Sequence, residues 1–184
     1  MNNKSVISLI FGFALIIIGC SKDSSLYNDV VQSKQGSNVS NAKGAVQLSG
    51  IGYFDVNDEC NSAGQGAAYS ILLTGDLVGC LYTFVEDFEC SPSGTYRETG
   101  TEYFVGTYNG VEGTFKTEYR FEGKYEGCAE DGSYVGAEIK GRCQHPLQDG
   151  TGTGVFEGVT GRVDFKDDIE AGNYPYRVIL NNLN

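Results

Sequence analysis

Three glutamates stand in segments rich in tyrosine and phenylalanine, and they are the residues of this sequence best suited to acid–base chemistry. Glu98 and Glu102 are four residues apart, and Glu86 precedes them in a run that contains several aromatic residues. A carboxylate enclosed by aromatic rings loses hydration, which disfavours its ionised form. Such a group can act as a general acid or base. We therefore predict an aromatic cavity with these glutamates as polar groups and three tyrosines as hydroxyl donors, namely Tyr82, Tyr96 and Tyr119.

Two structural alternatives compete with this site. A β-bulge at Gly100 or Gly106 would turn one or both of Glu98 and Glu102 outward. The glutamates could also pair with tyrosine hydroxyls for purely structural reasons. The catalytic residues therefore stay unassigned, with Glu86 as the third candidate.

Other arrangements that carry chemistry are absent from the sequence or incomplete in it. His145 is the only histidine, so a histidine-based zinc site is excluded, and Pro146 after it places it in a predicted rim loop with a surface role. The glycine-rich stretch 150–161 lacks the Lys-Ser/Thr end of a phosphate-binding loop. The run 55–59 resembles a calcium loop, but Cys60 occupies the position that needs glycine. We predict neither a metal nor a cofactor.

The clearest element that would position the glutamates is a hairpin around Asn109-Gly110. Residues 112–126 alternate aromatic or small residues with charged ones, which is the period of a strand with one buried face. Asn-Gly is a strong signal for a two-residue hairpin turn. That turn pairs residues whose numbers sum to 219, and the pairs are sensible: Phe104 with Phe115, Arg97 with Glu122, Gly100 with Tyr119, and Tyr96 with Gly123. Phe115, Tyr119 and Phe121 should then face inward.

Further strands are expected on either side of this hairpin, separated by Gly-, Asp- and Pro-containing turns. Together with the hairpin they make eight, and the others span about 67–74, 79–88, 133–143, 151–156, 159–167 and 173–182. No segment has a helical period. An eight-stranded meander can close on itself and remove its edges. We predict an all-β, antiparallel up-and-down barrel, with a β-sandwich as the alternative.

The segment 149–163, DGTGTGVFEGVTGRV, resembles a Gly-Thr-Gly-x-Phe-x-Gly-x-x-Gly element of the allene oxide cyclase-like barrels. That superfamily includes plant dirigent proteins and small bacterial relatives of unassigned function. The resemblance implies an eight-stranded barrel with a central cavity, in which this element joins late strands. It implies no activity, because no catalytic residue of the family aligns with this chain.

The N-terminus predicts export and a lipid anchor. Lys4 precedes a short apolar stretch that ends in Ile-Ile-Ile-Gly-Cys, which resembles the lipobox of bacterial lipoproteins. Cleavage before Cys20 would leave residues 1–19 as the signal peptide and lipid on the cysteine; an ordinary signal peptide is the alternative. Ser21 at the next position resembles outer-membrane sorting. Residues 20–50 are rich in Ser, Asn and Gly and predict a flexible tether, with the barrel domain at 51–184.

Five cysteines remain after Cys20, so at most two disulfides can form within one chain. An extracytoplasmic compartment permits them. Strand order predicts Cys90 with Cys128 or Cys60, at one rim, and Cys80 with Cys143 towards the other. The absence of Cys-x-x-Cys spacing disfavours a metal cluster.

The net charge of −11 becomes −12 when Lys4 is removed with the leader, and this acidity argues against binding nucleic acid. The favoured function is binding of a small apolar or aromatic molecule within the barrel. A cyclase or isomerase that uses an inward glutamate, and a surface interaction module with a filled barrel, are the alternatives. The oligomeric state, the identity of the ligand and the membrane leaflet are not predicted.

Overall fold

A computed structural model describes residues 44–60 and 64–183, and this part of the chain forms strands without a helix. Among these residues no helix is long and apolar enough to cross a membrane. The strands are β1 Val46–Phe54, β2 Tyr69–Gly75, β3 Leu77–Cys90, β4 Thr95–Tyr108, β5 Val111–Cys128, β6 Tyr134–Pro146, β7 Thr153–Gly154, β8 Thr160–Lys166 and β9 Tyr174–Asn181.

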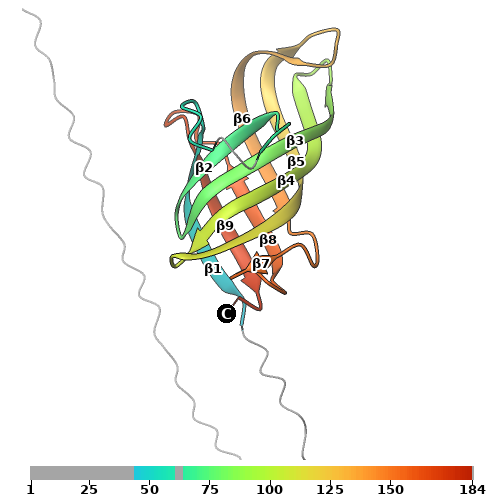
Figure 1. Cartoon of the computed structure of the whole chain (residues 1–184). Coiled ribbons are helices and arrows are strands. Elements are labelled where there is room, and N and C mark those ends of the chain that lie inside the picture. Colours follow the sequence, from blue (N-terminus) through green and yellow to red (C-terminus); the bar gives the residue numbers. More distant parts are fainter. Residues whose placement is uncertain (1–43, 61–63, 184) are drawn as a thin grey trace, which may run out of the picture. The chain divides into compact units, whose positions relative to one another are not determined.

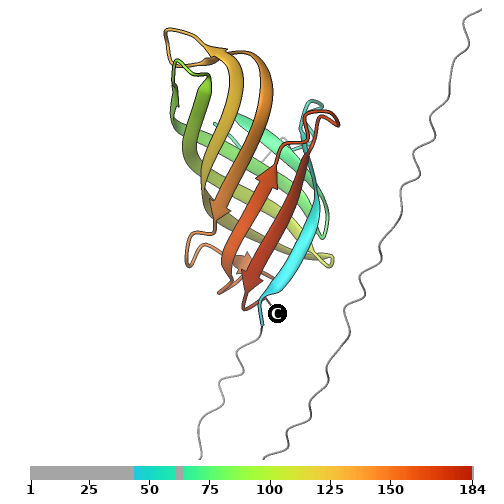
Figure 2. The same ribbon diagram turned by 180° about the vertical axis from the view of Figure 1, so that it is seen from behind.

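Eight of these strands close into an antiparallel up-and-down barrel (Figure 1). Neighbours in the chain pair with each other from β1 to β6, then β6 pairs with β8 and β8 with β9. Closure comes from β1 against β9, seen side by side from behind in Figure 2. The predicted barrel is therefore confirmed, and the sandwich alternative is wrong.

The β4–β5 hairpin has the register that its turn predicts. Gly100 pairs with Tyr119 and Phe104 with Phe115, and all the pairs sum to 219. Asn109 and Gly110 both have positive φ, 51° and 77°, as a type I′ turn requires. A side chain on Gly100 would collide with the Tyr119 ring, 2.7 Å from a Cβ there. The turn thus fixes which residues of both strands face inward.

The eighth barrel strand is not the predicted one. Residues 151–156 contribute only the two-residue β7, which pairs with β5, and β1 completes the barrel instead. β1 begins at Val46, so the predicted boundary between tether and domain at residue 50 falls inside a strand. Its apolar alternation is weak because Gly50 and Gly52 occupy positions where neighbouring side chains fill the space, those of Tyr176 and Ile71 respectively.

The segment after β7 closes one end of the barrel. Successive turns, in which the amides of Phe156 and Val159 donate to Thr153 and Phe156 carbonyls, bring the fully buried Phe156 ring inward. Gly154 and Gly158 have positive φ, which explains two glycines of the element. The Phe156 ring meets Phe115 edge to face at 5.1 Å. Around it the interior is packed with side chains that are less than 2% exposed: Leu73, Leu77, Phe104, Phe115, Val163, Val178 and Leu180.

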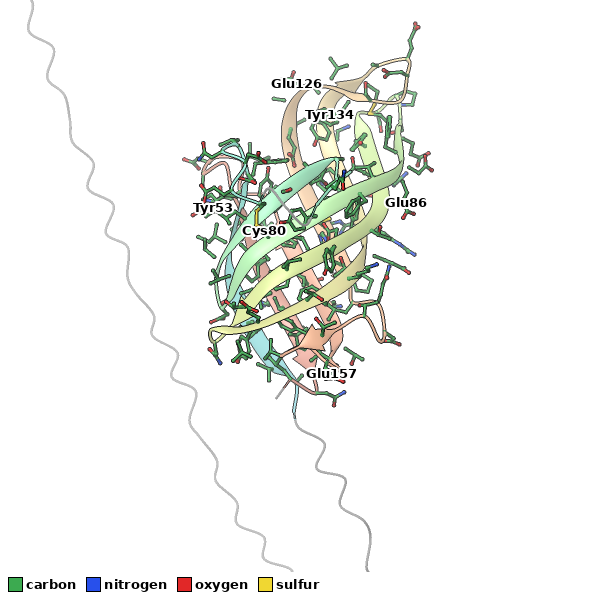
Figure 3. All side chains as sticks on the ribbon, in the orientation of Figure 1. Tyr53, Cys80, Glu86, Glu126, Tyr134 and Glu157 are labelled. Carbon is green, nitrogen blue, oxygen red and sulfur yellow. A yellow bond between two sulfur atoms is a disulfide. The ribbon has the colours of Figure 1, made fainter. Side chains whose placement is uncertain are left out.

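The described residues form two disulfides. Cys90–Cys128 joins the ends of β3 and β5 at the rim and is one of the two pairings predicted for Cys90. Cys60 pairs with Cys80 (Figure 3), so the Cys80–Cys143 prediction is wrong. Cys80 pairs across strands with Val105 on the outer wall, whereas Cys143 lines the interior. Side chains that point to opposite sides of a wall cannot be bridged without backbone movement.

Candidate functional site

The barrel end opposite Phe156 holds a cavity of about 340 Å³. Its residues come from the strand ends that the antiparallel meander brings to one rim, and from the strand interiors below. Eight of the lining residues are tyrosine or phenylalanine: Phe54, Tyr69, Tyr96, Phe121, Tyr125, Tyr134, Phe165 and Tyr174. The remaining residues are Glu98, Glu102, Glu138, Asp167, His145, Cys143, Ile71, Leu81 and Gly136.

Glu98 lies in the wall of this cavity and accepts hydrogen bonds from three tyrosines. The hydroxyls of Tyr69 and Tyr119 donate to Oε1, at 3.1 and 2.8 Å, and that of Tyr96 donates to Oε2 at 2.7 Å. Burial, and next the neighbouring Glu98, raise the pKa of Tyr69 and Tyr119 far above the ordinary value for tyrosine. The hydroxyls therefore keep their protons and their donor role at any physiological pH.

Glu102 is deeper and pairs with the only histidine. It is 3% exposed and accepts hydrogen bonds from Thr83 (3.1 Å) and Thr117 (2.7 Å). Its Oε2 also contacts His145 Nδ1. An ionised carboxylate can only accept, so the contact suits a ring that carries a proton on Nδ1. The His145 ring lies 4.8 Å from Phe165, and its Nε2 has no hydrogen-bond partner among the described residues.

A second pair of acidic side chains, Glu138 and Asp167, also borders the cavity. Burial, and next a hydrogen bond and charge repulsion from Asp167, raise the pKa of Glu138 to about 8. The two carboxyls approach each other over Gly141, where any side chain would overlap both. Glu138 Oε1 is buried and lacks a partner among the described residues. We call these two residues the acid pair.

Three of the predicted site residues, Glu86, Tyr82 and Tyr119, do not line the cavity, although the buried Tyr119 donates to Glu98 in its wall. Leu81 pairs with Phe104 and Thr83 with Glu102, which places Tyr82 on the outer wall, where the segment at Gly64 covers it. A β-bulge between Val85 and Asp87 then shifts the register, and Glu86 is exposed (Figure 3). The prediction placed Tyr82, Phe84 and Glu86 on the inward face, whereas Leu81 and Thr83 hold the inward positions. A bulge at Gly100 or Gly106 was the structural alternative, and the bulge occurs in the partner strand instead.

His145 also lies elsewhere than predicted. It is 4% exposed and belongs to β6, not to a rim loop. Proline holds the residue before it in an extended conformation, which a strand accommodates, and Pro146 ends β6. The alternation Gly141, Cys143, His145 was the signal that could have placed it inside. The acid-pair residues gave no comparable signal. Asp167 lies just beyond the end of β8, and the pairing of β6 with β5 is irregular at Glu138.

The remaining groups around the cavity limit its chemistry. Burial raises the pKa of the Cys143 thiol well above its ordinary value, so it stays protonated. In the described part of the chain Cys143 forms no disulfide. Among the same residues no group of three or more His, Cys, Asp or Glu side chains is arranged to hold a metal ion.

The fold and this site define a closed up-and-down β-barrel that is packed at one end and hollow, aromatic and acidic at the other. No protein-family model, no curated protein and no solved structure matches the chain.

Proposed function

We propose that this chain is a lipid-anchored extracytoplasmic barrel that binds a small apolar or aromatic molecule in its cavity. The main support for this proposal is that one end of the barrel interior is left empty while the other end is packed with side chains. Small-molecule sites typically measure roughly 300–1,000 Å³ and are mostly apolar with a few polar groups. A barrel that acted only through its surface would need no such space, so the cavity favours binding over a surface interaction module.

Attachment and sorting are part of the proposal and are supported by the sequence alone. The lipobox-like segment before Cys20 supports lipidation, and Ser21 supports sorting to the outer membrane; both lie outside the described residues. A relationship to the allene oxide cyclase-like barrels is supported by the 149–163 segment and by the cavity. Replacing Cys20 with Ala should move the protein from the detergent phase to the aqueous phase in Triton X-114 partition. Unchanged partition would contradict the anchor.

Binding can be tested by filling the cavity. Cys143→Phe places a ring in the space, whereas Val78→Phe adds the same ring at a position that is 52% exposed. We expect the neutral fluorescent probe N-phenyl-1-naphthylamine to bind the parent and Val78→Phe proteins and to lose most of its binding to Cys143→Phe. Native mass spectrometry of the parent should also show a copurified small molecule. Equal probe binding by all three folded proteins would contradict the proposal.

An enzyme is the second candidate, and the His145–Glu102 pair favours it. A carboxylate that holds Nδ1 leaves Nε2 of a neutral imidazole free to take a proton, the arrangement of a general base. A cyclase or isomerase working in this way would exchange a carbon-bound hydrogen of its bound molecule with solvent. Deuterium incorporation from D₂O that disappears in His145→Gln would support it. A bound molecule that never exchanges would exclude this proton transfer.

A further inference from the structure

We propose that the molecule bound in the cavity is a protonated amine with an aromatic or apolar body, and that its ammonium group lies at the acid pair. The inference rests on the proposed binding function and adds the chemical class of the ligand. Three observations carry it: the sign of the charges around the cavity, the polar atoms left without partners, and the rings around the acid pair.

The groups around the cavity favour a cation over an anion. Glu98, Glu102, Glu138 and Asp167 border it, and no lysine or arginine of the described residues does. Carboxylates enclosed in a partly desolvated space interact with a cation more strongly than exposed ones do. An anionic ligand would find no positive partner here. The charge alone therefore selects against carboxylate or phosphate ligands.

The polar atoms left without partners around the cavity favour a ligand that donates hydrogen bonds. The carboxylates of Glu98 and Glu102 already accept from tyrosine, threonine and histidine side chains. What remains without a partner among the described cavity residues is His145 Nε2 and Glu138 Oε1. With its proton on Nδ1, a neutral imidazole presents Nε2 as an acceptor. His145 is 4% exposed, and a buried acceptor left unpaired is costly. A ligand that brings N–H groups would satisfy both atoms.

The rings beside the acid pair suit an ammonium group. Tyr125 and Tyr134 stack with their ring centroids 3.9 Å apart, and Tyr134 meets Tyr96 edge to face at 5.1 Å. Tyr174 is close enough to both acids for their charges, after burial, to raise its pKa to about 12. Faces of aromatic rings attract cations, and cages of such rings recognise ammonium ligands. A metal ion is a poorer match, because the described residues contain no metal-binding cluster.

Binding should release a proton from the acid pair. The titratable groups facing Glu138 are Asp167 after β8, Tyr125 of β5, Tyr134 of β6 and Tyr174 of β9. The raised pKa values of Tyr125 and Tyr174 keep these two hydroxyls neutral, so Glu138 is the group that ionises when an ammonium group binds. With its pKa near 8 in the empty cavity, the affinity for the amine should fall by up to about tenfold per pH unit below 8.

Three probes of matched shape test the charge preference: 1-naphthylmethylamine, 1-naphthylmethanol and 1-naphthoate. We titrate each into the purified lipidated full chain in non-ionic detergent, with empty micelles as the blank, and follow the heat. At pH 7 the amine should bind on the order of tenfold more tightly than the alcohol, and the carboxylate should not bind measurably. Repeating the titration in buffers of different ionisation enthalpy should show proton release with the amine and none with the alcohol.

The double variant Glu138→Gln/Asp167→Asn tests whether the preference for the amine arises at the acid pair. It should reduce the affinity for the amine to that for the alcohol while leaving the alcohol unchanged, and unchanged alcohol binding also shows that the barrel is intact. The matched control is Glu126→Gln/Glu130→Gln, which replaces two carboxyl groups at exposed positions outside the cavity. It should keep the preference for the amine.

The outcomes separate the two proposals. If the alcohol binds as tightly as the amine, or if the acid-pair variant binds the amine like the parent, the cation inference is wrong and the binding function stands. If none of the three probes binds, the binding function is contradicted and the inference fails with it.

Discussion

The two ends of this barrel share the same strands but have opposite interiors. At the closed end Phe104, Phe115 and Phe156 fill the space, with Phe104 and Phe115 stacked at 4.8 Å. At the hollow end the inward positions of the same β4 and β5 strands carry Glu98 and Phe121, and about 340 Å³ stays empty. Strand pairing therefore does not decide whether the barrel is filled. The side chains at the inward positions do.

The packed end of the barrel would supply most of its stability, whereas the hollow end would bind the ligand. Apolar side chains at the closed end gain by close packing and need no partners. Each carboxylate at the hollow end must be satisfied, and Glu98 and Glu102 use six donors between them. These inward groups hold the wall in one arrangement without filling the space it encloses. A preformed cavity of this kind reduces the ordering that a ligand must impose.

The largest effect that would distinguish the two ends is the loss of a ring. Phe156→Ala should lower the free energy of unfolding by about 3–5 kcal/mol, because it leaves a void in a packed region. Phe121→Ala, which enlarges a space that is already empty, should cost roughly 1–2 kcal/mol. Urea denaturation followed by tyrosine fluorescence measures both. Equal losses would mean that the hollow end is packed as tightly as the closed one.

The next effect compares the two inward glutamates. Glu102→Leu would leave Thr83, Thr117 and His145 without their acceptor, all of them less than 5% exposed, and should cost about 2–4 kcal/mol. Glu98→Leu would release tyrosine hydroxyls in the cavity wall, where water can replace the carboxylate, and should cost about 1 kcal/mol. The same denaturation experiment compares them. If Glu98→Leu lost more free energy of unfolding than Glu102→Leu, Glu98 and not Glu102 would be the carboxylate that stabilises the fold.

Sequence alone was sufficient for the β4–β5 hairpin and the cavity residues it positions. A turn that needs two residues with positive φ fixes a register, and the register places Glu98, Glu102, Tyr96 and Tyr119 on one face without further information. The barrel class follows from the strand number and the absence of helical periods. The same topology narrowed the partner of Cys90 to Cys128 or Cys60, and Cys128 is the one it pairs with.

The rest depended on features that alternation cannot reveal. Glu86 was placed inward because it shares a face with Tyr82 and Phe84, but Leu81 and Thr83 hold the inward positions of β3 and a one-residue bulge leaves Glu86 unpaired. β1 was missed because neighbouring side chains from other strands occupy the space at its glycines. His145 was misplaced because Pro146 was taken as the signal of a loop. Pro146 is instead the last residue of β6, and His145 lies within that strand. Predicting the acid pair would have required knowing which strand ends lie at the same rim of the barrel.

The smallest effect concerns the acid pair and the pH dependence of stability. The pKa of Glu138 in the folded barrel is about 8, above its ordinary value of 4.5, so the folded state keeps a proton that the unfolded chain has lost. The stability linked to this proton is complete below about pH 4.5 and is lost as the pH rises through about 8. Glu138→Gln cannot ionise, so it should unfold at a temperature about 2 °C higher than the parent at pH 8.5, since partial exposure screens the repulsion, and at an equal temperature at pH 4.5.

Differential scanning fluorimetry at the two pH values measures this difference, with exposed Glu126→Gln as the control that should follow the parent at both. A parent-like loss of stability in Glu138→Gln would assign the pH dependence to other groups. The expected result would show that the hollow end loses stability at high pH because two carboxylates face each other without a cation. At the closed end, where only apolar side chains meet, no comparable dependence on pH can arise.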